Sequence, residues 1–217
     1  MAGKIKGRRT FLLYLLAGLF LLSLLFNFYQ VSLQLERNRV VQIYDGDSFT
    51  LSDGRKVRLL SVDAPDIDRC MGLEAKMYLE SLIFRKRVSL KDTVEDDYGR
   101  LLSNVYASGQ FVNAELVRQG LVLYHAGKSR ESERLKEAQN IAKSQKLGIY
   151  STLCRKTTPV SVCVIKGNIR AGNKIYHLPG CINYAQVIVD ESFGDRWFCT
   201  EEEAQASGYL KSGSCPD

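Results

Sequence analysis

Proline is scarce in this chain, with four residues among 217, so no long proline-rich stalk separates its parts. No internal repeat is visible, which gives no support to a solenoid or a propeller. Apolar residues make up 45% and charged residues 25%, proportions that exclude a mainly disordered or collagen-like chain. The length is sufficient for one folded domain and a small second one.

Acidic residues are absent from the first 35 positions, whereas residues 4–9 carry four Lys and Arg. The apolar run Phe11–Phe26 follows, and with its flanks it has the length of about 20 residues that crosses a bilayer as a helix. A cleaved signal peptide requires a small-residue site, which residues 27–31 lack. We therefore predict one helix that spans the membrane and contacts the lipid bilayer through residues 10–33. The N-terminus is expected in the cytoplasm and the remainder on the extracytoplasmic side.

The net charge of +6 is unevenly distributed along the chain. Residues 1–35 carry +4, and residues 36–158 also carry +4, from 21 Lys and Arg against 17 Asp and Glu. Residues 159–217 carry −2. The middle segment is therefore the expected binder of an anionic partner.

Cysteine pairs of the C-x-x-C type, the usual zinc signature, are absent. Six cysteines are present, and an extracytoplasmic location permits disulfides. Cys70 and Cys154 are free to pair with each other or to remain unpaired. The last 55 residues hold the other four, which are candidates for a zinc site or for two disulfides in one of three pairings: Cys163, Cys181, Cys199 and Cys215.

Apolar spacing and turn residues predict an α+β domain of about five strands and three helices, which suits a five-stranded OB-fold barrel. The expected strands are 40–44, 48–51, 56–62, 88–90 and 101–106, and the expected helices are 73–84, 112–118 and 131–146. Ser129 is a reasonable N-cap for the last of these helices. Beyond it, residues 157–161 are typical of a linker.

We therefore predict three parts: an anchor over residues 1–35, an OB domain over 36–156 and a small Cys-containing module over 157–217. Within the module, Gly167-Asn168 and Gly172-Asn173 are typical of turns. Residues 200–203 form a capping box that opens a short helix.

Acidic residues cluster at two turns that each follow an apolar strand. Asp45 and Asp47 lie at the first turn, and Asp63 and Asp66 lie at the second. Carboxylates at neighbouring strand ends suit a hard cation such as Ca²⁺, and the absence of histidine near them disfavours zinc there.

Two arginines accompany the acids, Arg58 on the third strand and Arg100 in a Tyr-Gly-Arg turn. Such guanidinium groups with a metal suit phosphodiester hydrolysis, because both neutralise charge on the transition state. Each residue alone has a structural alternative, since Asp-Gly-Asp is common in turns and a strand Arg commonly forms a surface ion pair. The combination in this order is more specific.

In this combination the sequence resembles the staphylococcal nuclease (thermonuclease) family over about residues 38–151. The stretches that carry the resemblance are 43–48 (IYDGDS), 57–66 (VRLLSVDAPD), 97–100 (DYGR), 113–121 (NAELVRQGL) and 146–150 (KLGIY). The resemblance implies an OB barrel with three helices. It also implies calcium-dependent cleavage of DNA and RNA that leaves 3′-phosphate ends.

The resemblance also implies roles for individual residues. Asp47 and Asp63 correspond to the calcium carboxylates, with the backbone carbonyl of Ala64 as a further ligand. Arg58 and Arg100 correspond to the pair that grips the phosphate, and Tyr98 to a nucleotide contact. Asp66 stands where the family has the Glu that serves as general base, and it is one methylene shorter. Asp45 corresponds to a supporting acid.

Two readings of the domain therefore remain open, an endonuclease and a catalytically weak or inactive OB module that binds nucleic acid or protein at the membrane. The C-terminal module resembles a small module found in other exported bacterial nucleases, and more faintly the zinc-bearing N-terminal domain of the Ada methyltransferase family. For its four cysteines, a zinc site and two disulfides therefore both stay open. No protein partner is identifiable from the sequence. His125, after the strand-like residues before it, is expected to have a loop or packing role.

Overall fold

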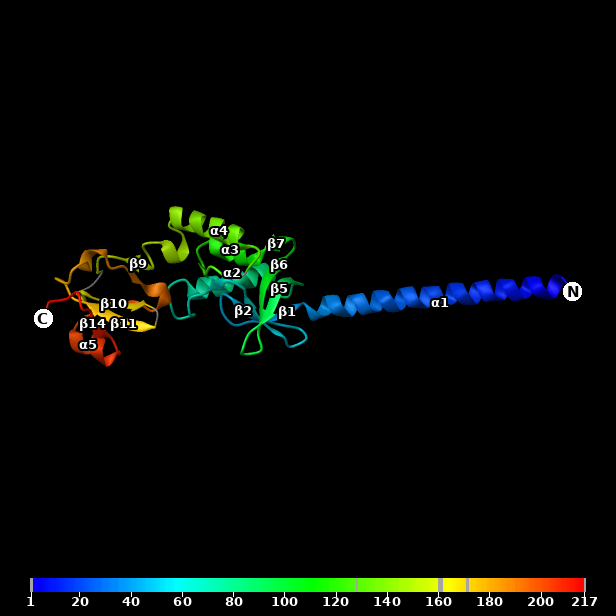
Figure 1. Cartoon of the computed structure of the whole chain (residues 1–217), viewed down its shortest axis with the longest axis horizontal. Coiled ribbons are helices and arrows are strands. Elements are labelled where there is room, and N and C mark those ends of the chain that lie inside the picture. Colours follow the sequence, from blue (N-terminus) through cyan, green and yellow to red (C-terminus); the bar gives the residue numbers. More distant parts are fainter. Residues whose placement is uncertain (1, 128, 160–161, 171, 217) are drawn as a thin grey trace.

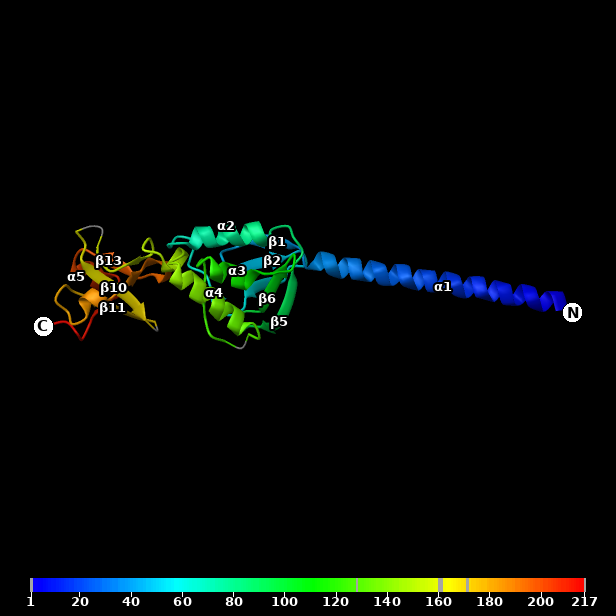
Figure 2. The ribbon, with the colours of Figure 1, turned by 90° about the horizontal axis from the view of Figure 1, so that it is seen from above.

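The computed structural model of the protein describes residues 2–127, 129–159, 162–170 and 172–216. The chain is elongated, with a long N-terminal helix at one end, a globular domain beside it and a smaller module at the other end (Figures 1 and 2). The two chain ends therefore lie at opposite extremes of the molecule.

Helix α1 (Ala2–Arg37) contains the predicted membrane segment. Its stretch Tyr14–Ser32 is the one helix of the described residues that is long and apolar enough to cross a bilayer, and none of it is buried against the rest of the chain. A membrane-spanning helix and a signal sequence share these properties. The helix continues without a break to the start of the globular domain (Figure 1).

The globular domain is built on a sheet in the order β1-β2-β3-β6-β5, with β7 paired to β6. Its elements are β1 (Val40–Ile43), β2 (Ser48–Leu51), β3 (Lys56–Leu59), β4 (Val62–Asp63), α2 (Gly72–Ile83), β5 (Ser89–Glu95), β6 (Leu101–Ala107), β7 (Gln110–Phe111), α3 (Val112–Arg118), β8 (Leu123–Tyr124) and α4 (Ser132–Ser144). The predicted OB-type α+β domain with three helices is confirmed. The predicted third strand is divided into β3 and β4, because the chain turns at Ser61 with a φ of 62°.

Strand pairing closes the sheet into a barrel. Strands β1, β2 and β3 form an antiparallel meander, whereas β3 and β6 are parallel, with Arg58 beside Leu102. The start of β1 then meets the start of β5 through an isolated bridge between Arg39 and Arg87. Backbone N–H groups of Val40 and Arg85 donate across the same seam. The edges of β1 and β5 are thereby partly paired at this seam.

Apolar side chains from the barrel and all three helices fill one core. Phe49 and Leu59 from the sheet, Leu79 from α2, Leu116 from α3 and Leu135 from α4 are each almost fully buried there. The buried amide of Asn113 fastens helix α3 to this core.

The side chain of Asn113 is buried at the start of α3 and hydrogen-bonds with three backbone groups, two within β6 and one just after β3. It accepts from the N–H of Val105 at 2.9 Å, and it donates to the carbonyl oxygens of Leu60 at 3.0 Å and Ser103 at 3.3 Å. These bonds tie the end of β3 to β6 and so fix the crossover that brings Arg58 and the residues before β6 together.

Two local predictions were wrong. Ser129 is not the N-cap of α4, which begins at Ser132; the Ser129 hydroxyl instead donates to Asn104 at 3.1 Å and accepts from the N–H of Glu131. Gly167 is not in a turn but in strand β10 (Ile165–Arg170), where a Cβ atom would lie 2.4 Å from the ring of Phe198. Glycine is required there by close approach rather than by chain reversal.

The C-terminal module has its own sheet in the order β13-β10-β11-β14 and its own small core. The remaining elements of the chain are β9 (Arg155–Lys156), β11 (Asn173–His177), β12 (Val189–Asp190), β13 (Arg196–Phe198), α5 (Glu201–Ala206) and β14 (Leu210–Lys211), with short 3-10 turns at Gly148–Tyr150, Tyr184–Gln186 and Glu191–Phe193. The predicted capping box opens α5, because Thr200 accepts from the N–H of Glu203. Whether the chain divides at residue 156 stays a prediction, since Lys156 on β9 pairs with Val189 of the module.

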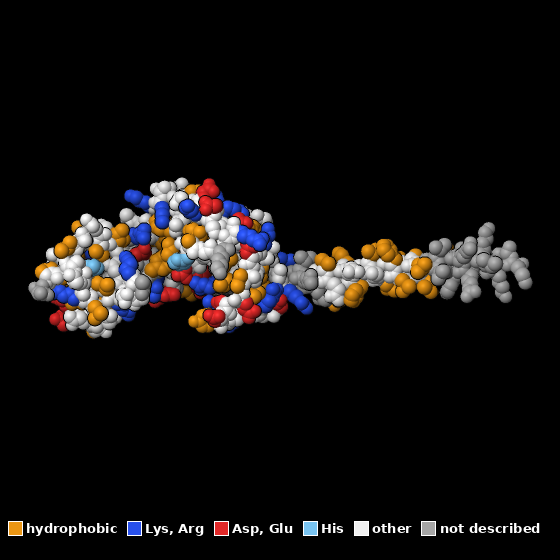
Figure 3. Space-filling model, in the orientation of Figure 1, with side chains coloured by type: hydrophobic (Ala, Val, Ile, Leu, Met, Phe, Trp, Pro, Cys, Tyr) orange, Lys and Arg blue, Asp and Glu red, His pale blue; other side chains and the backbone are white. Residues whose placement is uncertain are grey.

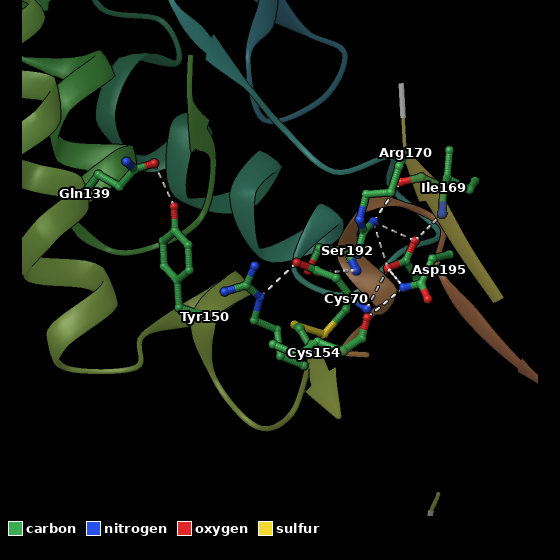
Figure 4. Close-up of polar contacts among 12 residues, drawn as sticks. Cys70, Gln139, Tyr150, Cys154, Ile169, Arg170, Ser192 and Asp195 are labelled. Atoms are coloured by element: carbon green, nitrogen blue, oxygen red, sulfur yellow. Dashed lines mark hydrogen bonds and ion pairs between the residues drawn. A yellow bond between two sulfur atoms is a disulfide. The ribbon is translucent and has the colours of Figure 1, made fainter. Parts of the chain in front are cut away.

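A polar contact joins the module to the globular domain next to a disulfide within that domain (Figure 4). Cys70, after the acidic turn, is bonded to Cys154, and the two Cα atoms are 5.6 Å apart. Next to this bridge Arg155 pairs with Asp190 at 2.9 Å. Within the module, the buried carboxylate of Asp195 accepts from the backbone N–H of Ile169 and pairs with Arg170.

Replacement of Asn113 by Ala should lower the free energy of unfolding by about 2–4 kcal/mol, because backbone groups of β6 and of the end of β3 lose buried partners. Thermal unfolding of the full chain in detergent will measure the loss. Asn140→Ala, a change of the same type at an exposed position of α4, is the matched control and should be near neutral. Equal stability of the two variants would contradict the role assigned to Asn113.

Candidate active site

The turn between β1 and β2 holds the first two acids of the site. Gly46 lies between them in close contact with α2, and a Cβ atom on it would be 2.5 Å from the Cβ of Ala75 and 2.8 Å from that of Ala64. The backbone N–H of Asp47 donates to the carboxylate of Asp45 at 3.0 Å. The Asp-Gly-Asp sequence is therefore a tightly packed turn that directs Asp47 into the domain.

Arg58 bridges two of the predicted site acids. Because Ser48 is opposite Arg58 in the β2–β3 pair, Asp47 lies next to the guanidinium group. Nη1 of Arg58 is 2.8 Å from Oδ1 of Asp47, and Nη2 forms a hydrogen bond and ion pair with Oδ1 of Asp63. The structure thus brings Asp47, Arg58 and Asp63 together, as the sequence pattern predicted.

The carboxylate of Asp47 is nearly completely buried, with 1% of the side chain exposed. Burial and then the negative charge of Asp45 raise the pKa of Asp47 to about 7, against the opposing effects of Arg58, Ser48 and the N–H of Ala64. The ionised form is therefore costly without positive charge nearby. A cation bound at this carboxylate would relieve that cost.

The oxygen atoms around Asp47 match the preferences of calcium. Asp63 is close because both carboxylates contact Arg58, and the backbone of Ala64 is close because its N–H donates to Oδ2 of Asp47 at 2.8 Å. Carboxylate and carbonyl oxygens are the ligands that Ca²⁺ prefers. Within the described ranges there is no cluster of three or more His, Cys, Asp or Glu that could hold a metal, and the calcium set implied by the resemblance contains two carboxylates only.

Asp66 lies apart from the Arg58 cluster. Its side chain is 63% exposed and pairs with Nη2 of Arg69 at 2.7 Å. Among the described side chains no hydrogen bond or ion pair joins Asp66 to Arg58. Arg69 in turn lies against the C-terminal module, since its guanidinium carbon is 3.3 Å from the position of a Cβ on Gly194.

Arg100 lies on the same side of the sheet as Arg58 but has a different partner. It precedes β6, and the parallel register places Arg58 beside Leu102, two residues further on. Its guanidinium group pairs with Asp96 at 2.9 Å and lies 5.4 Å from the ring centroid of Tyr98. Tyr98 is itself 84% exposed. The turn thus presents an aromatic ring and a cation beside the cluster.

His125 lies beside Asp63 of the site, whereas its sequence context predicts a loop or packing role. Its Nε2 atom is 3.8 Å from Oδ2 of Asp63, and 57% of its side chain is exposed. The backbone places it there, since Asp63 pairs with Leu123 and the N–H of His125 donates to Ser61. No sequence signal shows the β4–β8 pairing, because each strand has only two residues.

The four module cysteines form two disulfides, Cys163–Cys199 and Cys181–Cys215. The disulfide alternative is therefore the one present in this structure, and none of these sulfur atoms is available as a zinc thiolate. Cys70 and Cys154 also form a bond rather than remaining free.

The raised pKa of Asp47 predicts how stability depends on pH when no divalent cation is bound. A carboxyl whose pKa rises from 3.8 unfolded to about 7 folded favours the folded state most below pH 4, and this contribution is lost as pH rises to 7. Thermal unfolding in chelator between pH 5 and 8 should show this fall. Asp47→Asn should remove this fall in stability with rising pH, whereas Asp97→Asn, an exposed control, should leave the fall unchanged. The same pH dependence in the unaltered protein and both variants would contradict the assignment.

Comparisons with known proteins agree with this geometry. The chain matches the family described as Staphylococcal nuclease homologue over residues 56–152. It is 36% identical over 117 residues to an uncharacterized endonuclease of Haemophilus influenzae, covering 52% of this chain and 65% of that protein, slightly less than two thirds. It is 33% identical over 129 residues to a micrococcal nuclease of Shigella flexneri, covering 53% of this chain and 74% of that protein.

An uncharacterized endonuclease of Escherichia coli O157:H7 is 35% identical over 117 residues, which cover 52% of this chain and 76% of the relative. The family match contains Arg58, Asp63 and Arg100, and Asp47 precedes it in the barrel. The α+β barrel, the acid–arginine cluster around the buried Asp47 and these similarities converge. The chain belongs to the staphylococcal nuclease homologue family, and its matched domain is an endonuclease domain.

Proposed function

We propose that this protein is a membrane-anchored, calcium-dependent endonuclease that hydrolyses DNA and/or RNA outside the cytoplasm and leaves 3′-phosphate ends. The observation that carries the proposal is the guanidinium group of Arg58 between Asp47 and Asp63. A permanently charged planar cation beside paired carboxylates is suited to a phosphodiester and a divalent cation together.

Arg58 and Arg100 are proposed to bind the reacting phosphate. Both lie on one side of the parallel β3–β6 pair, so a phosphate above this pair is within reach of both groups once Arg100 leaves Asp96. Their charges would neutralise the negative charge that accumulates on the phosphate oxygens in the transition state. Tyr98 is proposed to contact a neighbouring nucleotide.

Calcium is proposed to bind Asp47, Asp63 and the carbonyl oxygen of Ala64. When bound, it would supply Lewis-acid polarisation of the phosphate and of a water molecule. The raised pKa of Asp47 supports this placement, because cation binding and deprotonation of a buried carboxyl assist each other. His125, close to Asp63, lies at the edge of the same group.

Asp66 is proposed as the general base that takes a proton from the attacking water. The water oxygen bonds to phosphorus, the bond from phosphorus to the 5′ oxygen breaks, and that oxygen receives a proton to become a hydroxyl. Base catalysis requires an approach of about 2.6–3.2 Å or one bridging water. Asp66 must therefore leave its ion pair with Arg69 or act through a bridging water. This pairing favours a second candidate, a catalytically weak or inactive nucleic-acid-binding module.

The anchor and the location are also proposals. Within about 20 residues of the apolar stretch, the N-terminal side carries four Lys and Arg, whereas Arg37 and Arg39 are the two on the other side. This imbalance supports an N-terminus in the cytoplasm. Three disulfides in the remainder are consistent with an oxidising compartment. We retain the division into an anchor over 1–35, a nuclease domain over 36–156 and a module over 157–217.

The decisive experiment is a cleavage assay of the purified full chain with calcium or with chelator. Single-stranded DNA, duplex DNA and RNA are supplied in parallel, and the ends of the products are identified. Cleavage with calcium and its loss with chelator are expected. Binding without cleavage under both conditions would favour the inactive module over the enzyme.

Site variants test the individual roles in the same assay. Arg58→Ala and Arg100→Ala should each lower kcat by about 10²-fold or more, whereas Asp66→Glu should retain or raise cleavage. Arg118→Ala removes an exposed arginine of α3 and should have no effect. A folded Arg100→Ala protein with unchanged turnover would show that the phosphate site was assigned wrongly.

The proposed topology predicts protease sensitivity in sealed membrane vesicles of known sidedness. Protease on the extracytoplasmic side should remove residues 36–217, and protease on the cytoplasmic side should leave them intact. A gel with an antibody to the C-terminal module reads the result. Degradation from the cytoplasmic side would reverse the assigned orientation.

A further inference from the structure

Basic side chains surround the point where α1 enters the nuclease domain, and we call them the basic collar. They come from three segments that are distant in sequence and are all at least partly exposed. The basic collar consists of Arg37, Arg39, Arg55, Arg85, Lys86 and Arg87. In Figure 3 basic side chains gather where the helix meets the globular part.

The fold holds these segments together. Glu36 at the end of α1 pairs with both Arg39 and Arg87, and Arg55 donates to the side chain of Asn38 at 2.7 Å. The backbone N–H of Val40 donates to the carbonyl of Lys86 at 2.9 Å. Among the described residues, the ion pairs of the collar involve two acids, Glu36 and Asp53. The collar has six basic side chains and therefore keeps an excess of positive charge.

The height of the collar above the apolar stretch matches a lipid headgroup layer. The stretch ends at Ser32, and α1 continues for five residues to Arg37. At 1.5 Å per residue these five residues rise about 7.5 Å. Headgroups occupy roughly 5–7 Å on each side of the hydrocarbon core. Arg37, Asn38, Asp53 and Arg55 line a surface hollow of about 460 Å³ at this level.

The collar and the Arg58–Asp47 pair lie towards opposite ends of the same short strands. Strand β1 runs from the collar to the Asp45 turn, and β3 runs from Arg55 to Arg58. Helix α2 runs the same way, from Ala75 beside Gly46 to Ile83, two residues before Arg85, and these eight steps along the helix rise about 12 Å. A nucleic acid held at the site is therefore not directed towards the collar, whereas a bilayer crossed by α1 is.

We infer that the basic collar binds the headgroups of anionic phospholipids and seats the nuclease domain on the membrane with its active site facing away. The inference rests on the proposed membrane crossing of α1 and not on the proposed chemistry. Phosphates of the lipid would contact the guanidinium and ammonium groups from several sides of the helix exit. The domain would then stand on the surface rather than swing freely on a tether.

Hydrogen–deuterium exchange of the full chain in nanodiscs tests this inference. Amides of residues 52–56 and 84–88 should exchange several-fold more slowly in phosphatidylglycerol-containing discs than in phosphatidylcholine discs. The difference should vanish at about 1 M salt, where the Debye length is about 3 Å. Arg85→Gln with Lys86→Gln should abolish it, while Lys136→Gln with Lys143→Gln on α4, an equal change of charge, should not.

Each other outcome overturns the inference. Equal exchange in both discs, for a chain that resists extraction by alkaline carbonate, refutes the collar but keeps the membrane span. Extraction by carbonate refutes the span and the collar together. Protection of the collar by a DNA oligonucleotide, but not by phosphatidylglycerol, would assign the surface to nucleic acid. None of these results depends on whether the protein cleaves DNA or RNA. A failure of the proposed chemistry would appear in the cleavage assay and not in this experiment.

Discussion

The buried carboxylate of Asp47 is the constraint on which the site depends. A charged oxygen with almost no contact to water must lie beside positive charge or remain protonated, and its pKa of about 7 reflects that choice. The barrel meets the requirement by placing β3 next to β2, so that Arg58 contacts Asp47 directly. Asp63 contacts the same guanidinium group.

The parallel pairing of β3 with β6 is the second requirement. It brings the turn with Tyr98 and Arg100 to the side of the sheet that holds Arg58, although some 40 residues lie between them in sequence. Asn113 fixes this arrangement through bonds to β6 and to the end of β3. The proposed phosphate binding by the two arginines and the stability of the fold are therefore linked through one buried amide.

Local patterns predicted most of the domain, because alternation, helix spacing and turn residues each act within a few residues. The strands around Asp47 and Arg58 and the short helix at Thr200 follow from such patterns. The sequence did not show the place of His125 beside Asp63, which depends on a distant partner. It also did not show that Arg100 pairs with Asp96, four residues away in its own turn. The prediction of a turn at Gly167 was wrong for a related reason, because the rings that exclude a side chain there come from distant positions in the sequence.

The C-terminal module meets the catalytic domain at the turn that carries Asp66. Arg69 lies between Asp66 and Gly194, and Cys70 is bonded to Cys154, three residues before the module begins. Two contacts with parts of the chain outside the barrel, one through Arg69 and one through Cys70, therefore hold the turn that carries Asp66. The module is in a position to influence the exposed acid even though it carries a net negative charge.

The bond between Cys70 and Cys154 has a separate consequence for the life of the molecule. It closes a ring of chain with a sequence separation of 84, which contains β5, β6 and helices α2 to α4. An enzyme in the surroundings that nicks any exposed loop within the ring would not release a fragment, because both pieces would stay covalently attached until a reductant arrived. The protein would thereby keep its full mass after damage of this kind.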